Sequence, residues 1–241
     1  MAALPCLAMI LYAVASMLFG KPTEKNSSSP ASEKTTACAI KPFCNVVIEK
    51  GNNYNIDVEV NKGPKPVINV PDNWEEYVEY SVDNSTLTIN LTSSDIGKGT
   101  ISLSTPLITS IKGCSNGVKI NGFATDSIRI TNTDDLTLSN CSLAKLSVGF
   151  SSDTDYFSQD ICADSTLIDS LFVGFGCNSL DILTPSGGRI NVVEWHNTDS
   201  RDSYLHSIVK KANIGTFNWT PIEGQSIEFN TTKAASINLD K

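Results

Sequence analysis

The sequence predicts an all-β fold, a right-handed β-solenoid of the parallel β-helix kind with an N-terminal β-hairpin cap. Short apolar–x–apolar triplets recur at nearly regular intervals from residue 101 onward, and their middle residues are mostly polar. Such a triplet is a short strand that turns its outer residues inward and its middle residue toward solvent. Ser, Thr, Asn, Asp and Gly fill the positions between triplets, as tight corners require.

The spacing of these triplets predicts stacked coils. Most triplets begin 8 to 10 residues after the previous one, and gaps of 17, 25 and 27 residues leave room for a further strand or an inserted loop. Two or three strands per turn give coils of roughly 18 to 27 residues, and one coil cannot bury its own apolar face unless others stack on it about 4.8 Å away. A β-sandwich, which also has closely spaced strands, is the alternative fold. The triplets are Ile101/Leu103, Val118/Ile120, Ile128/Ile130, Leu136/Leu138, Leu146/Val148, Leu171/Val173, Leu180/Ile182, Ile190/Val192, Phe217/Trp219, Ile227/Phe229 and Ile237/Leu239.

Two pairs of longer alternating strands precede the triplets. Residues 46–60 and 78–91 each contain two such strands, and the turns between them fall at Gly51-Asn52-Asn53 and Asp83-Asn84-Ser85. Each strand alternates apolar and polar residues, so each buries only one face. We expect two β-hairpins that cover the exposed edge of the first coil.

The front of the chain predicts export. Residues 1–20 are almost all apolar, and an A-x-A-like cleavage site at Ala13-Val14-Ala15 favours a signal peptide, with an uncleaved signal anchor or lipidation at Cys6 as alternatives. Residues 21–37 are rich in Ser, Thr, Lys and Pro and predict a flexible linker. Residues 38–241 then form the head domain.

The charge balance excludes several partners. The net charge is −8, and the longest basic run is Lys210-Lys211, whereas nucleic acids and anionic membranes require a concentrated basic face. We therefore expect no nucleic acid, and membrane contact only through the N-terminal segment. Only two histidines are present, which makes His-based metal sites and catalysis improbable. No cofactor is predicted.

The cysteines allow disulfides. Six remain beyond the N-terminal segment, an even number in a chain predicted to be exported. Cys141 and Cys162 are 21 residues apart, close to one coil length, which would stack them within disulfide range. Two stacked free thiols are the equally supported alternative. The six are Cys38, Cys44, Cys114, Cys141, Cys162 and Cys177.

An aromatic group is the candidate binding surface. Phe172 occupies the middle position of its triplet, where nearly every counterpart is polar. An outward aromatic group can stack on sugar rings or anchor a partner protein, unless a loop or the cap covers it. The candidate group consists of Phe150, Phe172, Phe175, Tyr156 and Phe157.

The densest acidic stretch gives a weak calcium candidate. Asp153, Asp155 and Asp160 have the oxygen ligands and D-x-D spacing that Ca²⁺ accepts, but no EF-hand loop or nonapeptide repeat accompanies them. A solvated acidic loop is the favoured interpretation, with no metal site. Carboxylate pairs on a β-helix can also cleave polysaccharides, and residues 193–216 carry Glu194, His196 and further polar groups. No residue is assigned a catalytic role.

The N-terminal features resemble a known family. Three segments are similar to the auto-transporter adhesin family with a head GIN domain, found on exported proteins of Bacteroidetes-type bacteria. They are Phe43-x-x-Val46-x-Ile48, Gly51-x-x-Tyr54-x-Ile56-x-Val58 and Tyr80-Ser81-Val82-x-x-x-Thr86-Leu87-Thr88-Ile89. The resemblance covers about residues 43–241 and implies repetitive β-structure and a surface-exposed, non-catalytic head.

These observations together predict an exported adhesin-like binding module that recognises a glycan or a protein at a cell surface. A carbohydrate-active enzyme on the same scaffold and a purely structural envelope protein are the alternatives.

Overall fold

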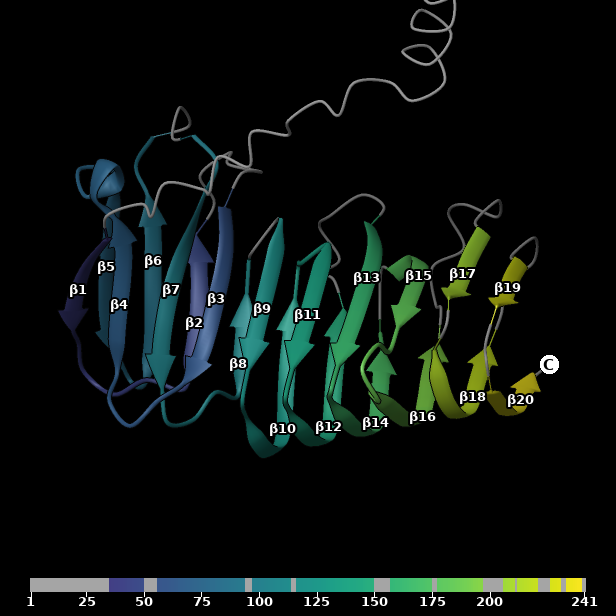
Figure 1. Cartoon of the computed structure of the whole chain (residues 1–241). Coiled ribbons are helices and arrows are strands. Elements are labelled where there is room, and N and C mark those ends of the chain that lie inside the picture. Colours follow the sequence, from purple (N-terminus) through teal and green to yellow (C-terminus); the bar gives the residue numbers. More distant parts are fainter. Residues whose placement is uncertain are drawn as a thin grey trace, which may run out of the picture. The chain divides into compact units, whose positions relative to one another are not determined.

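The computed structural model describes residues 35–49, 56–93, 97–113, 116–149, 157–174, 177–196, 206–210, 212–220, 226–230 and 233–239. They form strands and one short 3₁₀ helix, so the all-β prediction is confirmed (Figure 1). The described residues belong to one compact unit, Lys34–Lys241. Within these ranges no helix is long and apolar enough to cross a membrane. The predicted signal segment and most of the predicted linker lie outside the described residues.

The strands form two large mixed sheets. Sheet A has the spatial order β1 (Thr35–Ala39), β4 (Val67–Pro71), β7 (Gly99–Thr105), β3 (Ile56–Lys62), β9 (Gly117–Asn121), β11 (Asp135–Ser139), β13 (Phe157–Asp164), β15 (Cys177–Leu183), β17 (His206–Lys210) and β19 (Ser226–Asn230). Sheet B has the order β20 (Lys233–Leu239), β18 (Asn213–Thr220), β16 (Arg189–His196), β14 (Leu167–Val173), β12 (Ser142–Gly149), β10 (Ala124–Thr131), β8 (Ser110–Lys112), β2 (Asn45–Glu49), β6 (Thr86–Leu91) and β5 (Val78–Asp83).

From β8 onward, successive strands alternate between the two sheets. Each pairs in parallel with the strand two places further along the chain, as β9 does with β11 and β10 with β12. The three long gaps between triplets contain β8, β13 and β17, so each holds a strand that the triplet pattern missed.

The apolar core fills the space between the sheets. In sheet A, Val118, Leu136, Ile161 and Ile182 lie in register on consecutive strands, and all four are buried. Alternation along each strand turns these residues inward and their neighbours outward. A long column of the same kind in sheet B consists of Val46, Ile111, Ile130, Val148, Val173, Trp195 and Trp219. Each fully buried aliphatic side chain contributes about 1.5–3 kcal/mol relative to an exposed one.

A column of corner residues carries the chain from sheet A to sheet B. Gly122, Asn140, Ser165 and Ser186 follow β9, β11, β13 and β15, and their φ angles are 82°, 53°, 48° and 50°. The Asn140 N–H donates to the Asp164 carbonyl oxygen of the next strand at 3.1 Å. Left-handed backbone suits Gly and Asn, so the small polar residues between triplets have the corner role that the sequence predicts.

Only the second predicted hairpin is present. β5 and β6 pair antiparallel around Asn84 and Ser85, whose φ angles are 47° and 62°. The first hairpin is wrong, because β2 lies in sheet B and β3 in sheet A. β2 pairs in parallel with β6 and β8, and β3 with β7 and β9. Both strands are half-buried, and distant segments cover the same apolar faces that a hairpin would have covered.

Antiparallel strands lie at one end of each sheet. β1 and β4 end sheet A, and β5 ends sheet B. β1 begins at Thr35, inside the predicted linker, because it pairs with β4. The 3₁₀ helix Asp72–Trp74 places the Trp74 side chain, only 2% exposed, against the core at this end.

Candidate functional site

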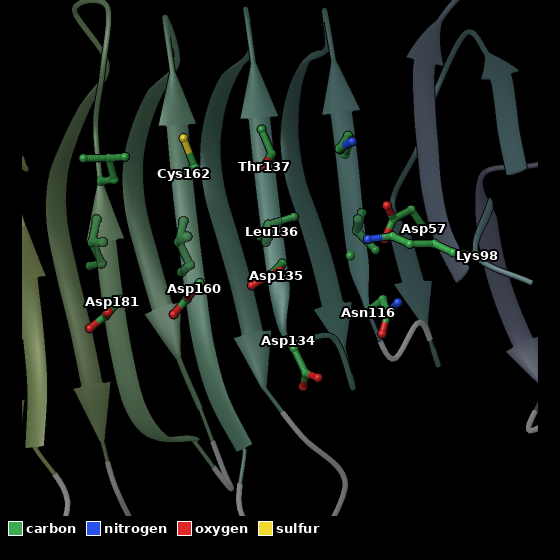
Figure 2. A pocket seen from close by; sticks show the side chains of 16 residues that line it. Asp57, Lys98, Asn116, Asp134, Asp135, Leu136, Thr137, Asp160, Cys162 and Asp181 are labelled. Carbon is green, nitrogen blue, oxygen red and sulfur yellow. The ribbon is translucent and has the colours of Figure 1, made fainter. Parts of the chain in front are cut away.

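Four aspartates lie along the outward face of sheet A. Asp135 on β11 is in register with Asp160 on β13, and Asp160 with Asp181 on β15. On the other side, Gly117 of β9 separates Asp135 from Asp57 of β3. Adjacent strands are about 4.8 Å apart, so three of these carboxylates are immediate neighbours. We call Asp57, Asp135, Asp160 and Asp181 the acidic row (Figure 2).

The acidic row lines a hollow of about 720 Å³. Lys98 and Lys119 also line it, and Figure 2 shows the Lys98 side chain reaching along Asp57. Gly117 leaves room for the Asp57 carboxylate, because a Cβ at position 117 would lie only 3.1 Å from Asp57 Oδ1. Leu183, 38% exposed, adds an apolar side chain. The hollow therefore offers carboxylates, two ammonium groups and one exposed apolar group.

The Asp134 carboxyl group, which also lines this hollow, has a raised pKa. Burial, followed by repulsion from Asp135 and Asp160, raises its pKa from 3.8 to about 6. Its Oδ1 is buried and accepts no hydrogen bond from the described residues. Its backbone carbonyl is held firmly, because the Gln159 Nε2 and the Asp160 N–H both donate to it at 2.9 Å. These two bonds fix the backbone at Asp134, close enough to Asp135 and Asp160 for their charges to act on its carboxyl group.

The described residues do not assemble the calcium candidate. Asp153 and Asp155 lie outside them, and Asp160 belongs to the acidic row. Within the described ranges, no group of three or more His, Cys, Asp or Glu side chains is placed to hold a metal ion. What the row can do chemically is attract cationic groups and repel anionic ones.

Phe172 lies on the outward face of sheet B. Its neighbours Leu171 and Val173 are buried, so strand alternation turns the ring outward, and it is 38% exposed. The predicted outward position of Phe172 is therefore confirmed. Ser147 of β12 and Glu194 of β16 are in register with it on either side.

A cation accompanies the ring. The Lys145 ammonium lies 4.8 Å from the Phe172 ring centroid, a cation–π contact. Arg129 of β10 lies in the same register row as Phe172, with Ser147 between them. We call Arg129, Lys145, Ser147, Phe172 and Glu194 the Phe172 surface.

The remaining predicted aromatic residues do not join this surface in the described part of the chain. Phe150, Tyr156 and Phe175 lie outside it. Phe157 begins β13 in sheet A, whereas Phe172 lies in sheet B. The grouping is wrong for Phe157, because the chain changes sheet between these two residues, and it stays a prediction for Phe150, Tyr156 and Phe175.

The proposed disulfide is wrong in this structure, because Cys141 and Cys162 are both free thiols. Residues in register on β11 and β13 are 25 positions apart in the sequence, so Cys162 of β13 is in register with Thr137. Cys141 lies at the corner after β11, and its N–H donates to Thr166 Oγ1 at 3.1 Å. Burial raises the pKa of both thiols. The second alternative, free thiols, holds for both residues, but they are not stacked on one another.

The segment that looked most suited to catalysis is only partly described. Glu194 faces outward, and its Oε1 accepts a hydrogen bond from Asn218 Nδ2 at 2.7 Å. Trp195 is buried and stacks on Trp219, with ring centroids 5.8 Å apart. Residues 197–205 lie outside the described residues.

The acidic row escaped the sequence analysis, although a signal existed. Asp135, Asp160 and Asp181 each precede a branched apolar residue that lies in one core column. These pairs are 25 and 21 residues apart, so a fixed period does not align them. A sequence comparison that allowed unequal spacing between paired strands would have found the row.

No family model and no curated protein sequence matches this chain. Solved structures do resemble it. A candidate adhesin from Parabacteroides distasonis ATCC 8503 has a TM-score of 0.50 and 14% identity, over 86% of this chain and 96% of that one. A candidate adhesin from Bacteroides fragilis NCTC 9343 has a TM-score of 0.47 and 14% identity, over 86% and 95%. A candidate lipid-binding protein from Parabacteroides distasonis has a TM-score of 0.41 and 12% identity, over 86% and 96%. At these identities the first of the three supports a shared fold, and nothing finer.

Proposed function

We propose that this chain is the head of an exported, adhesin-like surface protein that binds a glycan or a partner protein and performs no catalysis. The binding face is the Phe172 surface. The single observation that carries the proposal is an exposed aromatic ring on a sheet face whose register neighbours are polar or charged. Exposed aromatic rings are costly in water and typical of recognition surfaces.

The proposed scaffold is a right-handed β-solenoid with an N-terminal cap. Parallel register between strands two places apart supports it, as do the stacked corner residues. An antiparallel sandwich would pair its strands the other way. The antiparallel strands at the β1 and β5 ends are suited to closing the first coil.

The adhesin character is drawn from the name of the Parabacteroides distasonis neighbour with the TM-score of 0.50. The N-terminal resemblance to adhesins with a head GIN domain agrees with it. Export rests on the apolar first segment and the polar linker that follows it. Together they describe a tethered head that displays a rigid sheet face.

A polysaccharide-cleaving enzyme is the second candidate function. The observation that favours it is Asp134, whose pKa of about 6 lies near the working range of a general acid, beside Asp135 and Asp160. A structural envelope protein without a specific ligand is the third candidate. The exposed Phe172 ring disfavours it, because the contact of the ring with Lys145 at an exposed site stabilises the fold only weakly.

Retention of the full chain on immobilised polysaccharides, mucins and an unrelated protein surface tests these functions. We expect saturable retention on a glycan or mucin surface, at least about fivefold weaker for Phe172→Ala, with the polymer left intact. Leu107→Ala is the matched control, since Leu107 is an exposed apolar residue outside the Phe172 surface. Release of soluble sugar by the wild type but not by Asp134→Asn would support the enzyme instead. No retention on any surface would refute the binding function.

A further inference from the structure

The Phe172 surface contains a lysine, Lys145, whose neighbours in register on the adjacent strands are uncharged. Lys145 is exposed on β12, and the residues in register with it are Ser127 on one side and Ser170 on the other. Its ammonium therefore lies over the Phe172 ring rather than against a carboxylate in register. A cation–π contact at an exposed site is weak, and the four-carbon stem of lysine lets the ammonium turn to a better partner.

A second cation lies on the same side of the ring. Arg129 is exposed on β10, in one register row with Ser147 and Phe172. Two strand spacings separate Arg129 from Phe172, about 10 Å between backbones, which is the length of roughly two sugar rings. Glu194, on the far side of Phe172, already accepts the Asn218 amide at 2.7 Å. Two cations, Lys145 and Arg129, therefore lie on the side of the ring toward β10, together with the exposed Asp126 carboxylate of that strand, whereas Glu194 places a carboxylate directly beside the ring on the other side.

The rest of the molecule carries the opposite charge. The net charge is −8, and the outward face of sheet A has the acidic row. Salt screens charges beyond about 8 Å at physiological ionic strength, so the groups nearest a ligand decide where it binds. The acidic row therefore disfavours an anionic ligand on sheet A, whereas Lys145 and Arg129 favour one on sheet B.

We propose that the ligand of the Phe172 surface is an acidic glycan, whose sugar rings bear carboxylate or sulfate groups. This inference rests on the proposed binding function and adds the chemical class of the ligand. The apolar face of one sugar ring packs on Phe172, and its anionic group draws the Lys145 ammonium away from the aromatic ring. Arg129 receives the next anionic group along the polymer, which its planar guanidinium can bind in bidentate fashion.

Binding of the full chain to three immobilised polymers tests this assignment: neutral dextran, dextran sulfate and polygalacturonate. At 0.15 M salt we expect about tenfold tighter binding to either acidic polymer than to dextran, falling steeply as salt rises. Lys145→Gln weakens acidic-polymer binding about three- to fivefold and leaves dextran binding unchanged, and Lys145→Arg restores it. Lys119→Gln is the matched control, since Lys119 is an exposed lysine on sheet A.

The outcomes separate the inference from the function beneath it. If dextran binds as tightly as the acidic polymers, or if Lys145→Gln has no effect while Phe172→Ala abolishes retention, the binding function holds and the acidic class is wrong. If Lys119→Gln weakens binding as much as Lys145→Gln, general charge and not the Phe172 surface selects the ligand, which also refutes the assignment. If no polymer is retained, both proposals fail on glycans.

Discussion

Replacing Asp134 by Asn should stabilise the fold at neutral pH and lose this advantage in acid. The Asp134 carboxyl group is partly buried, and this burial, followed by repulsion from the Asp135 and Asp160 charges, raises its pKa from 3.8 to about 6. The folded chain therefore holds this proton more tightly than the unfolded chain. The stabilisation from protonation is fully present below the unfolded pKa and is lost as pH rises through about 6. Above that pH, wild type carries a repelled carboxylate, and the Asn variant does not.

The size of the effect follows from the shift. A shift from 3.8 to about 6 corresponds to at most about 3 kcal/mol for a fully enclosed group. Asp134 is partly open to solvent, which screens the repulsion, so we expect about 1 kcal/mol at pH 8. Linkage with these pKa values leaves about half of that difference at pH 5.

Urea unfolding of both proteins at pH 5, 6, 7 and 8, followed by circular dichroism, measures this difference. The comparison cancels the titration of the carboxyl groups that do not interact with Asp134. Asp126→Asn is the matched control, because Asp126 is exposed on β10, away from the acidic row. A difference between Asp134→Asn and wild type that stays constant from pH 5 to pH 8 would refute the reasoning, as would an equal pH dependence in the control.

Three further predictions concern the scaffold. Leu146→Ala, at a fully buried site in sheet B, should lower the free energy of unfolding measured in urea by about 3 kcal/mol. Leu107→Ala, at a site 45% exposed, should change it by less than about 1 kcal/mol. Similar losses in the two variants would contradict the core assignment. Alkylation of the unfolded, unreduced chain should label both Cys141 and Cys162, and a disulfide-linked peptide in the mass spectrum would contradict the register. Asn84→Val should cost about 1 kcal/mol in thermal unfolding because the φ angle is 47°, while Asn84→Gly should not; equal stability of the two variants would argue against the left-handed turn.

Local patterns predicted the elements that depend on neighbours in sequence. The hairpin of β5 and β6 was predicted because its strands and its Asn84-Ser85 turn are contiguous. Alternation predicted the inward and outward sides of the described triplets except at Ile190/Val192, where Val193 is buried and Val192 is in register with Ser170. It also predicted that Phe172 points away from the core. These features need only the two-residue period of a strand and the turn preferences of small polar residues.

Pairing between distant strands could not be read in the same way. The sequence around β2 and β3 is compatible with a hairpin, yet β2 pairs with β6 and β8, and β3 with β7 and β9. Alternation shows that a strand has one apolar face, but it does not show which other strand packs beside it or covers that face. β13 escaped detection because its inward pair is Ile161 and Ala163, and alanine gives a weak apolar signal.

The candidate site depends both on local alternation and on pairing between distant strands. The sequence by itself determined that Phe172 points away from the core, that Asp135, Asp160 and Asp181 alternate with apolar residues, and that the chain is acidic overall. Only the tertiary structure decided which of them meet. Register offsets of 18, 25 and 21 residues between β9, β11, β13 and β15 align the aspartates and separate Cys141 from Cys162. The pairing of β12 with β14 brings Lys145 over Phe172. The physical reason is that extra residues at a corner cost little free energy, whereas the buried columns must stay in register. Core packing, and not the length of chain between strands, therefore fixes which outward residues become neighbours.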